Sequence, residues 1–104
     1  ASWPPFSYLA LIRVSSHKKD FTWEFLNSAH QIIEKDKLND INIMGPVSAP
    51  MERKAGKYRG QLLLHCENRK SLHQQISLFI KKIERKKCTH RVKWSVDIDP
   101  IELF

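Results

Sequence analysis

The sequence is poor in glycine and cysteine, and this scarcity removes several classes of protein. Its only glycines are Gly45, Gly56 and Gly60, so the phosphate-binding loop Gly-x-x-x-x-Gly-Lys-Ser/Thr is absent. Cys66 and Cys88 are the only cysteines, and with their histidine neighbours they lack the spacing of a zinc knuckle. We therefore expect two reduced thiols, at least one of them buried, in preference to a disulfide or a zinc site.

Long apolar runs are also missing. No segment approaches the roughly 18–20 apolar residues that cross a membrane, and no charged-then-apolar leader opens the chain, so we expect neither membrane insertion nor secretion. The 104 residues, 41% of them hydrophobic and 10% aromatic, suit a single domain over 1–104 with a packed core. Ala1 in place of methionine indicates a fragment of a longer protein.

Positive charge, by contrast, is abundant and unevenly distributed. The formal net charge is +7, with five basic and five acidic residues in 1–50 against thirteen basic and six acidic in 51–104. A concentrated positive field favours a polyanionic partner, such as nucleic acid or an acidic protein. The plainer alternative is that these side chains only keep an ordinary surface soluble.

Hydrophobic periodicity predicts six elements. In order, they are a strand over 6–16, a helix over 20–37, a strand over 41–47, a strand over 58–66, a helix over 68–86 and a strand over 91–98. The first strand is apolar on both sides, which indicates a central position in the sheet. Gly45-Pro46 interrupts the second, which indicates an edge or bulged strand, and 48–57 is predicted to be a loop.

Capping residues and aromatic positions refine this prediction. Asp20 is the expected N-cap of the first helix, and Glu67-Asn68 is the expected cap of the second. Tyr8 and Trp94 are expected to pack in or against the core. The order βαββαβ predicts an α+β fold, a two-layer ferredoxin-like sandwich with both helices on one face of a mixed or antiparallel sheet.

Four sequence blocks carry a family resemblance. They are WPPFSYLALIR at 3–13, MGPVSAPMERKAGKYRGQLLLH at 44–65, NRKSLHQQI at 68–76 and RVKWSVDIDPIELF at 91–104. In this order they resemble the C-terminal domain of PriA, the bacterial primosomal replication-restart helicase. The resemblance implies a fold like that of ribosomal protein S10 and a cytoplasmic, nucleoid-associated parent.

The resemblance also implies how this chain relates to its parent. Residues 1–5, with Pro4-Pro5, would link it to a helicase lobe. The parent would be an ATP-dependent 3′–5′ DNA helicase whose ATP, magnesium and zinc belong to parts not present here. This fragment is therefore expected to be no enzyme and to need no cofactor of its own.

The expected DNA-binding residues fall into two clusters. The first interleaves cations with an aromatic ring around Gly56, and the second lies near the end of the last helix and the start of the last strand. Arginine and lysine contact phosphates, and tyrosine stacks on bases. The residues are Arg53, Lys54, Lys57, Tyr58 and Arg59 in the first cluster, and Arg85, Lys86, Arg91 and Lys93 in the second. Replacing Arg53, Lys54 and Lys57 by alanine is expected to weaken binding to single-stranded and forked DNA.

Two further residues follow from the resemblance alone. It implies that the acidic tail of single-stranded DNA-binding protein docks at the start of the second helix, at Arg69 and His73. The alternative is that Arg69 simply faces water in the first helical turn. For the whole domain, the runner-up function is an S10-like protein that binds RNA or assembles into a larger complex. Asp97 and Asp99 are expected to have structural roles.

Overall fold

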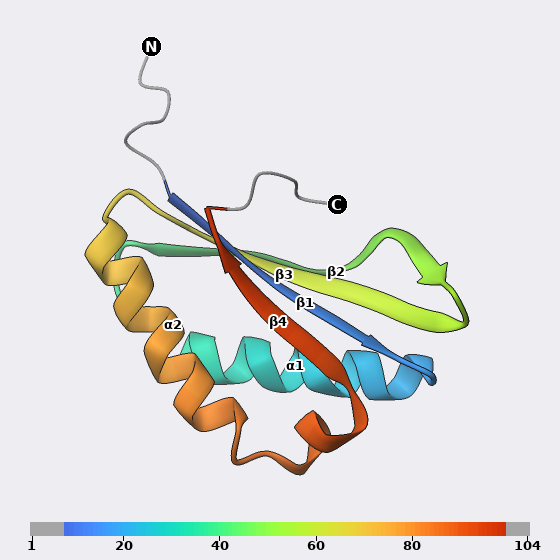
Figure 1. Cartoon of the computed structure of the whole chain (residues 1–104). Coiled ribbons are helices and arrows are strands. Elements are labelled where there is room, and N and C mark those ends of the chain that lie inside the picture. The colour runs from blue at the N-terminus through green and yellow to red at the C-terminus, as the bar shows by residue number, and fades with distance from the viewer. Residues whose placement is uncertain (1–7, 100–104) are drawn as a thin grey trace.

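The computed structural model describes residues 8–99, except for the side chains of Pro50, Met51 and Lys54. Four strands and two α-helices follow one another along the chain in the order βαββαβ (Figure 1). They are β1 (Tyr8–Ser16), α1 (Lys19–Lys35), β2 (Ile41–Lys54), β3 (Lys57–Cys66), α2 (Arg69–Ile83) and β4 (Lys93–Ile98), with a 3-10 helix η1 (Lys87–Arg91) before β4. The predicted linker at 1–5 lies outside the described residues.

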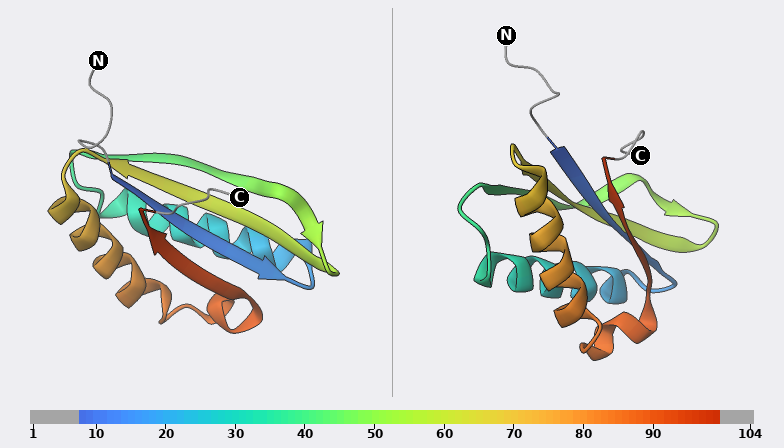
Figure 2. Two further views of the ribbon diagram at one scale, coloured as in Figure 1. Left: turned by 45° about the horizontal axis from the view of Figure 1, so that its top comes forward. Right: turned by 60° about the vertical axis from the view of Figure 1, so that its left-hand side comes forward.

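The strands form one antiparallel sheet in the order β2-β3-β1-β4. Both helices cover the same face of this sheet (Figure 2). This arrangement confirms the predicted two-layer sandwich and the central position of β1. Leu11 explains the apolar character of both sides of β1, because it is fully buried although it does not belong to the core beneath the helices.

The core lies between the helices and the sheet. The helical spacing of apolar residues places Phe25 of α1 and Phe79 of α2 in its centre, both fully buried. Trp94 of β4 packs on both rings, at centroid distances of 5.7 and 6.0 Å. Tyr8 packs at the edge of the same cluster, so the core assignment of both aromatic residues is confirmed.

The predicted loop over 48–57 is wrong, because β2 continues through most of it to Lys54. Register shifts between Met44 and Val47 and between Ser48 and Arg53 absorb the irregular stretch, as bulges do in edge strands. A two-residue turn remains at Ala55 and Gly56, with φ values of 53° and 76°. A two-residue hairpin turn needs such positive angles, so β2 and β3 form one long hairpin.

The start of α1 and the start of β4 also differ from the prediction, whereas the cap of α2 agrees with it. Lys18 rather than Asp20 is the N-cap of α1, without a side-chain hydrogen bond, and Asp20 lies in the first turn. Of the predicted pair Glu67-Asn68, Asn68 caps α2, its Oδ1 accepting from the amides of Lys70 and Ser71 at 2.9 and 3.2 Å. The last strand begins only at Lys93, because the preceding residues form η1.

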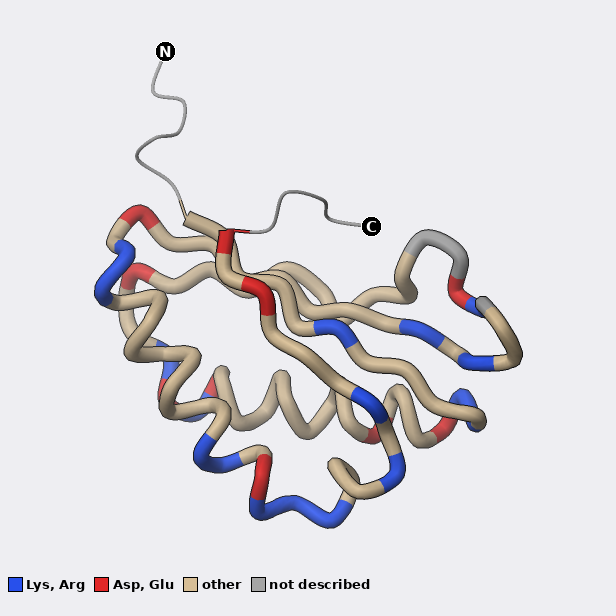
Figure 3. The backbone as a smooth tube through the Cα atoms, in the orientation of Figure 1, with Lys and Arg blue, Asp and Glu red and all other residues tan. Residues whose placement is uncertain are grey.

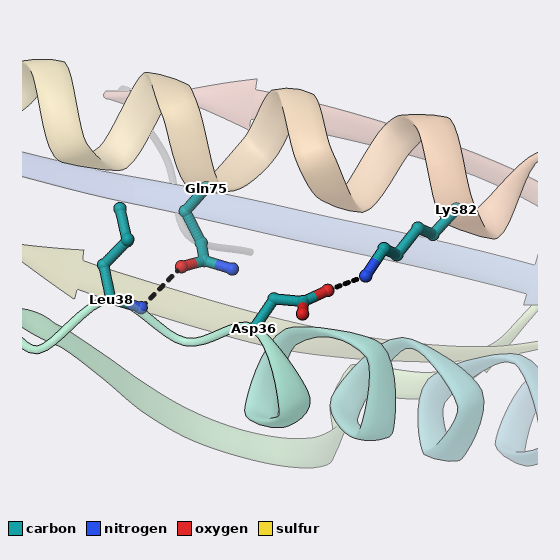
Figure 4. Close-up of polar contacts among 4 residues, drawn as sticks. All are labelled: Asp36, Leu38, Gln75 and Lys82. Atoms are coloured by element: carbon teal, nitrogen blue, oxygen red, sulfur yellow. Dashed lines mark hydrogen bonds and ion pairs between the residues drawn. The ribbon is translucent and has the colours of Figure 1, made fainter.

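Polar contacts anchor α2 to the end of α1 (Figure 4). The side chain of Gln75 is buried, and its Oε1 accepts a hydrogen bond from the Leu38 amide at 2.9 Å. Further along α2, Lys82 forms an ion pair with Asp36, which directly follows α1. These two contacts set how the C-terminal half of α2 lies against α1.

Candidate nucleic-acid interface

The sheet face opposite the helices carries a cluster of cations. Alternation along each strand directs Arg13 of β1, Arg59 of β3 and Lys93 of β4 toward this face. In the register, Ser15 lies opposite both Arg59 and Lys93, and Arg13 is two residues away on the same strand. Three strands therefore bring their basic residues to the same end of the sheet, as Figure 3 shows.

These cations surround a cavity of about 270 Å³, which we call the sheet-face groove. Its charged lining residues are Arg13, Lys57, Arg59 and Lys93, and its neutral polar ones include Gln61 and Ser95. Of the four cations, Lys57, Arg59 and Lys93 are predicted DNA-binding residues. Arg13 was missed, because it lies in the half of the sequence with no net charge and only the pairing of β1 with its neighbours places it here.

One carboxylate partly neutralises the positive charge at this groove. Asp97 of β4 pairs with Arg13, Oδ2 to Nη1, at 2.7 Å, with both side chains more than one-third exposed. Asp99 binds the backbone instead: its Oδ1 accepts from the Leu9 amide at 3.3 Å, and its amide donates to the Leu9 carbonyl at 2.6 Å. The two residues thus hold β1 and β4 together, in agreement with the structural roles expected for them.

A second basic cavity adjoins the first. It has a volume of about 220 Å³, and Lys57 and Lys93 line both cavities. His17, His90 and Arg91 extend the basic lining toward η1. Basic side chains therefore continue from the sheet face around the end of the strands.

Arg91, another predicted DNA-binding residue, also makes contacts within the fold. Its Nη1 lies 3.5 Å from a carboxylate oxygen of Glu24. Its guanidinium lies 5.1 Å from the ring centroid of Phe21, and Lys18 approaches the same ring at 5.5 Å. Arg91 thereby ties η1 to the start of α1.

Two more of the predicted DNA-binding residues lie near the turn of the β2–β3 hairpin. Arg53 and Tyr58 are directly opposite in the register, and the guanidinium lies 5.3 Å from the ring centroid. Because Arg53 lies over one face of the ring, a base can stack on that face of Tyr58 only if Arg53 moves. The side chain of Lys54 lies outside the described residues.

A polar network holds the turn end of this hairpin against α1. The Thr22 hydroxyl donates to the Tyr58 carbonyl at 2.9 Å and lies 2.7 Å from the hydroxyl of Ser16. The Ser16 hydroxyl in turn donates to the Lys18 carbonyl at 2.6 Å. Because Ser16 and Thr22 are buried, these bonds give the groove a rigid support.

The other predicted residues lie elsewhere on the molecule. Arg85 and Lys86 line a cavity between the helices, in the layer opposite the sheet-face groove. Arg69 and His73 lie one turn apart near the start of α2, exposed, with Nε of Arg69 3.5 Å from Nε2 of His73. The second predicted DNA-binding cluster is therefore divided between two layers, and the two partner-binding residues are brought together.

Comparison with known proteins decides the family. A family model described as the primosomal protein N C-terminal domain matches residues 1–101. The chain belongs to this family. Replication restart protein PriA of Haemophilus influenzae is 30% identical over 100 residues, covering 96% of this chain and 13% of that protein. The PriA protein of Buchnera aphidicola is 30% identical over 101 residues, covering 93% of this chain and 14% of that protein.

Solved structures are similar in fold alone. The de novo designed protein Foldit4 has a TM-score of 0.65 at 7% identity, covering 92% of this chain and 99% of the design. A dimeric ferredoxin-like protein from an uncultured marine organism has a TM-score of 0.59 at 9% identity, covering 88% of this chain and 92% of that protein. These neighbours agree with the ferredoxin-like prediction for this primosomal domain.

The two cysteines are free and buried, which confirms the prediction for them. Burial raises the pKa of the Cys66 thiol above its ordinary value. Cys66 is held at the start of α2, where its thiol lies 3.1 Å from the Asn68 carbonyl and its sulfur accepts from the Asn68 amide at 3.3 Å. Within residues 8–99, neither helix has the length and apolar character needed to cross a membrane.

Proposed function

We propose that this domain binds the phosphate backbone of nucleic acid in the sheet-face groove and serves a replication restart protein as a binding and docking domain. The observation that carries the proposal is the convergence of Arg13, Lys57, Arg59 and Lys93, from three strands, on one cavity. Arginine and lysine side chains neutralise phosphates of a nucleic-acid strand and release their counterions. Ser95 and Gln61 add hydrogen-bonding groups beside them.

The lining favours contact with phosphates over contact with bases. Trp94 borders the cavity, but its ring packs in the core against Phe25 and Phe79. Among the described lining residues of the groove, no other side chain is aromatic. Sheet-face modules that recognise single strands by sequence stack bases on exposed aromatic rings, so binding in this groove is expected to depend little on sequence.

The family suggests the biological setting. The relatives are named replication restart proteins, and the chain spans only 13–14% of the two just compared. We propose that single-stranded and forked DNA are the ligands and that the parent is an ATP-driven helicase of the bacterial cytoplasm and nucleoid. In this proposal the present domain contributes binding, and the ATPase chemistry resides in other parts of the parent.

Arg69 and His73 are proposed to receive the acidic tail of single-stranded DNA-binding protein. Their side chains are exposed and adjacent, and an arginine suits a carboxylate because its planar guanidinium can donate two parallel hydrogen bonds. Titration of the tail peptide against the wild type and Arg69→Ala tests this role. Equal affinity for both proteins removes Arg69 from the site.

Charge reversal tests the groove itself. Arg59→Glu with Lys93→Glu reverses two cations of the lining, whereas Lys70→Glu with Lys81→Glu makes the same change in net charge on exposed positions of α2. We expect the groove variant to lose at least about tenfold in affinity for an oligothymidine, about 1.4 kcal/mol. The helix variant should lose much less. An equal loss in both variants would mean that net charge alone attracts the nucleic acid.

The choice of nucleic acid separates the two functional classes. Forked DNA, single-stranded DNA and an RNA hairpin are compared at one salt concentration, each with the wild type and the groove variant. The replication proposal predicts that fork and single-stranded DNA bind more tightly than the RNA hairpin. Preference for the hairpin would instead support the S10-like RNA-binding alternative.

A further inference from the structure

The layer of helices contains another cavity, larger than the two at the sheet. It has a volume of about 570 Å³ and lies between α1 and the end of α2, and we call it the helix-face groove. Its lining consists of Ser28, Gln31, Ile32, Lys35, Lys82, Arg85 and Lys86. The first four recur at i, i+3, i+4 and i+7 and so form one stripe of α1.

Charge and apolar surface are combined in this groove. Ile32 is half-buried and packs against the core, so it supplies an aliphatic surface in the lining. Lys35 lies on the α1 side, and Lys82, Arg85 and Lys86 lie on the α2 side. The groove is therefore amphipathic, with cations from both sides and an aliphatic side chain from α1 in its lining.

Three of the four cations have no ion-pair partner among the described residues. Lys82 is paired with Asp36 (Figure 4). Lys35, Arg85 and Lys86 are exposed and form no ion pair with any residue that the structure describes. Their positive charge is thus available to a ligand in the groove.

We propose that the helix-face groove docks an acidic segment of a protein partner, with carboxylates meeting Lys35, Arg85 and Lys86 and an apolar side chain resting on Ile32. A segment that alternates acidic and apolar residues complements both the cations and the aliphatic surface. A nucleic-acid strand complements only the cations, since Ile32 offers no aromatic face on which a base stacks. A second copy of this chain is disfavoured by repulsion, because each copy carries a net charge of +7.

This site is distinct from both surfaces discussed above. The sheet-face groove lies in the opposite layer, on the strands. Arg69 lies thirteen residues before Lys82 in the sequence, which corresponds to about 20 Å along a helix. A ligand of the helix-face groove should therefore bind independently of substitutions at either of the other two surfaces.

Three fluorescein-labelled peptides provide the probe. One repeats Glu-Glu-Leu, the second repeats Gln-Gln-Leu and lacks the charge, and the third repeats Glu-Glu-Ser and lacks the apolar side chain. Binding to the full 104-residue chain is followed by fluorescence anisotropy. We expect the Glu-Glu-Leu peptide to bind most tightly, because only it matches both the cations and Ile32.

Two variants locate the site, and each has a control. Lys35→Glu with Arg85→Glu should weaken binding of the Glu-Glu-Leu peptide about tenfold, because two attractive contacts become repulsive. The control Lys70→Glu with Lys81→Glu alters net charge equally, on exposed positions outside the groove. Gln31→Trp obstructs the groove without altering charge and should also weaken binding, whereas Arg69→Ala and the sheet-face variant should leave it unchanged.

Three results would overturn the proposal. The first is an equal loss of peptide binding in the groove variant and its control, which would reduce the effect to net charge. The second is equal binding of the Glu-Glu-Ser and Glu-Glu-Leu peptides, which would remove Ile32 from the site. The third is displacement of the peptide by oligothymidine together with a similar loss of oligothymidine affinity in the groove variant, which would make the groove a nucleic-acid site.

Discussion

Replacing Lys57, Arg59 and Lys93 together by alanine removes three of the four cations that line the sheet-face groove. If each contacts one phosphate of a single strand, each contributes about 0.7 to the slope of log affinity against log salt concentration, so the slope should decrease by about 2.1. When the salt concentration rises from about 50 to about 200 mM, the affinity of both proteins falls. The factor by which it falls should be about 18 times smaller for the variant than for the wild type. The fold should tolerate the change, because Lys93 is exposed and the half-buried Lys57 and Arg59 lie outside the hydrophobic core.

The measurement is a titration of labelled oligothymidine by anisotropy at several salt concentrations. The matched control replaces Lys70, Lys81 and Lys87, which are exposed and lie outside the groove. It lowers the net charge by the same amount but should leave the slope nearly unchanged. The slope is more informative than a single affinity, because it counts contacts with phosphates.

The result that would refute the reasoning is an unchanged slope in the groove variant, or an equal decrease in the control. Either outcome would mean that these three cations do not meet phosphates. The structure also revises the test suggested by the sequence, in which Arg53, Lys54 and Lys57 are replaced. Of the described side chains in that set, Lys57 lines the groove and Arg53 lies over Tyr58, so we expect Lys57→Ala to account for most of any change in slope.

Three predictions concern the fold that supports the grooves. Gly60→Ala should lower the free energy of unfolding by about 1–3 kcal/mol in chemical denaturation, because the new methyl group would lie 2.5 Å from Cδ1 of the fully buried Leu26; unchanged stability would show that Leu26 can move aside. Gln75→Leu should cost about 1–3 kcal/mol in the same assay, because the Leu38 amide loses its acceptor, and a stability equal to that of the wild type would contradict this. Since burial raises the pKa of Cys66 in the folded state, stability should be retained below the ordinary thiol pKa and decrease as the pH rises above about 9; the wild type should lose more stability than Cys66→Ala over that range, and parallel curves would argue against the effect.

Much of the fold could be predicted because local periodicity encodes which side of an element is buried. The alternation in β3 and β4 and the spacing of Phe25 and Phe79 identified the core faces, and the order of elements identified the sandwich. The extent of β2 could not be predicted in this way. In the sequence, Gly45 and Pro46 predict that the strand ends. In the structure, β2 continues to pair with β3 after two shifts in register.

The basic sites could be predicted from the sequence less completely than the fold, because tertiary structure decides which basic residues come together. The sequence alone determined that the second half is strongly cationic and that Arg59 and Lys93 are among its candidate DNA-binding residues. The structure added Arg13, which is separated from Lys93 by eighty residues of sequence and reaches the same groove because β1 lies between β3 and β4. It also separated Arg85 from that groove, since α2 packs on the other side of the sheet. Periodicity along a chain specifies faces, but which faces meet is decided by long-range strand pairing and by the side of the sheet on which each helix packs.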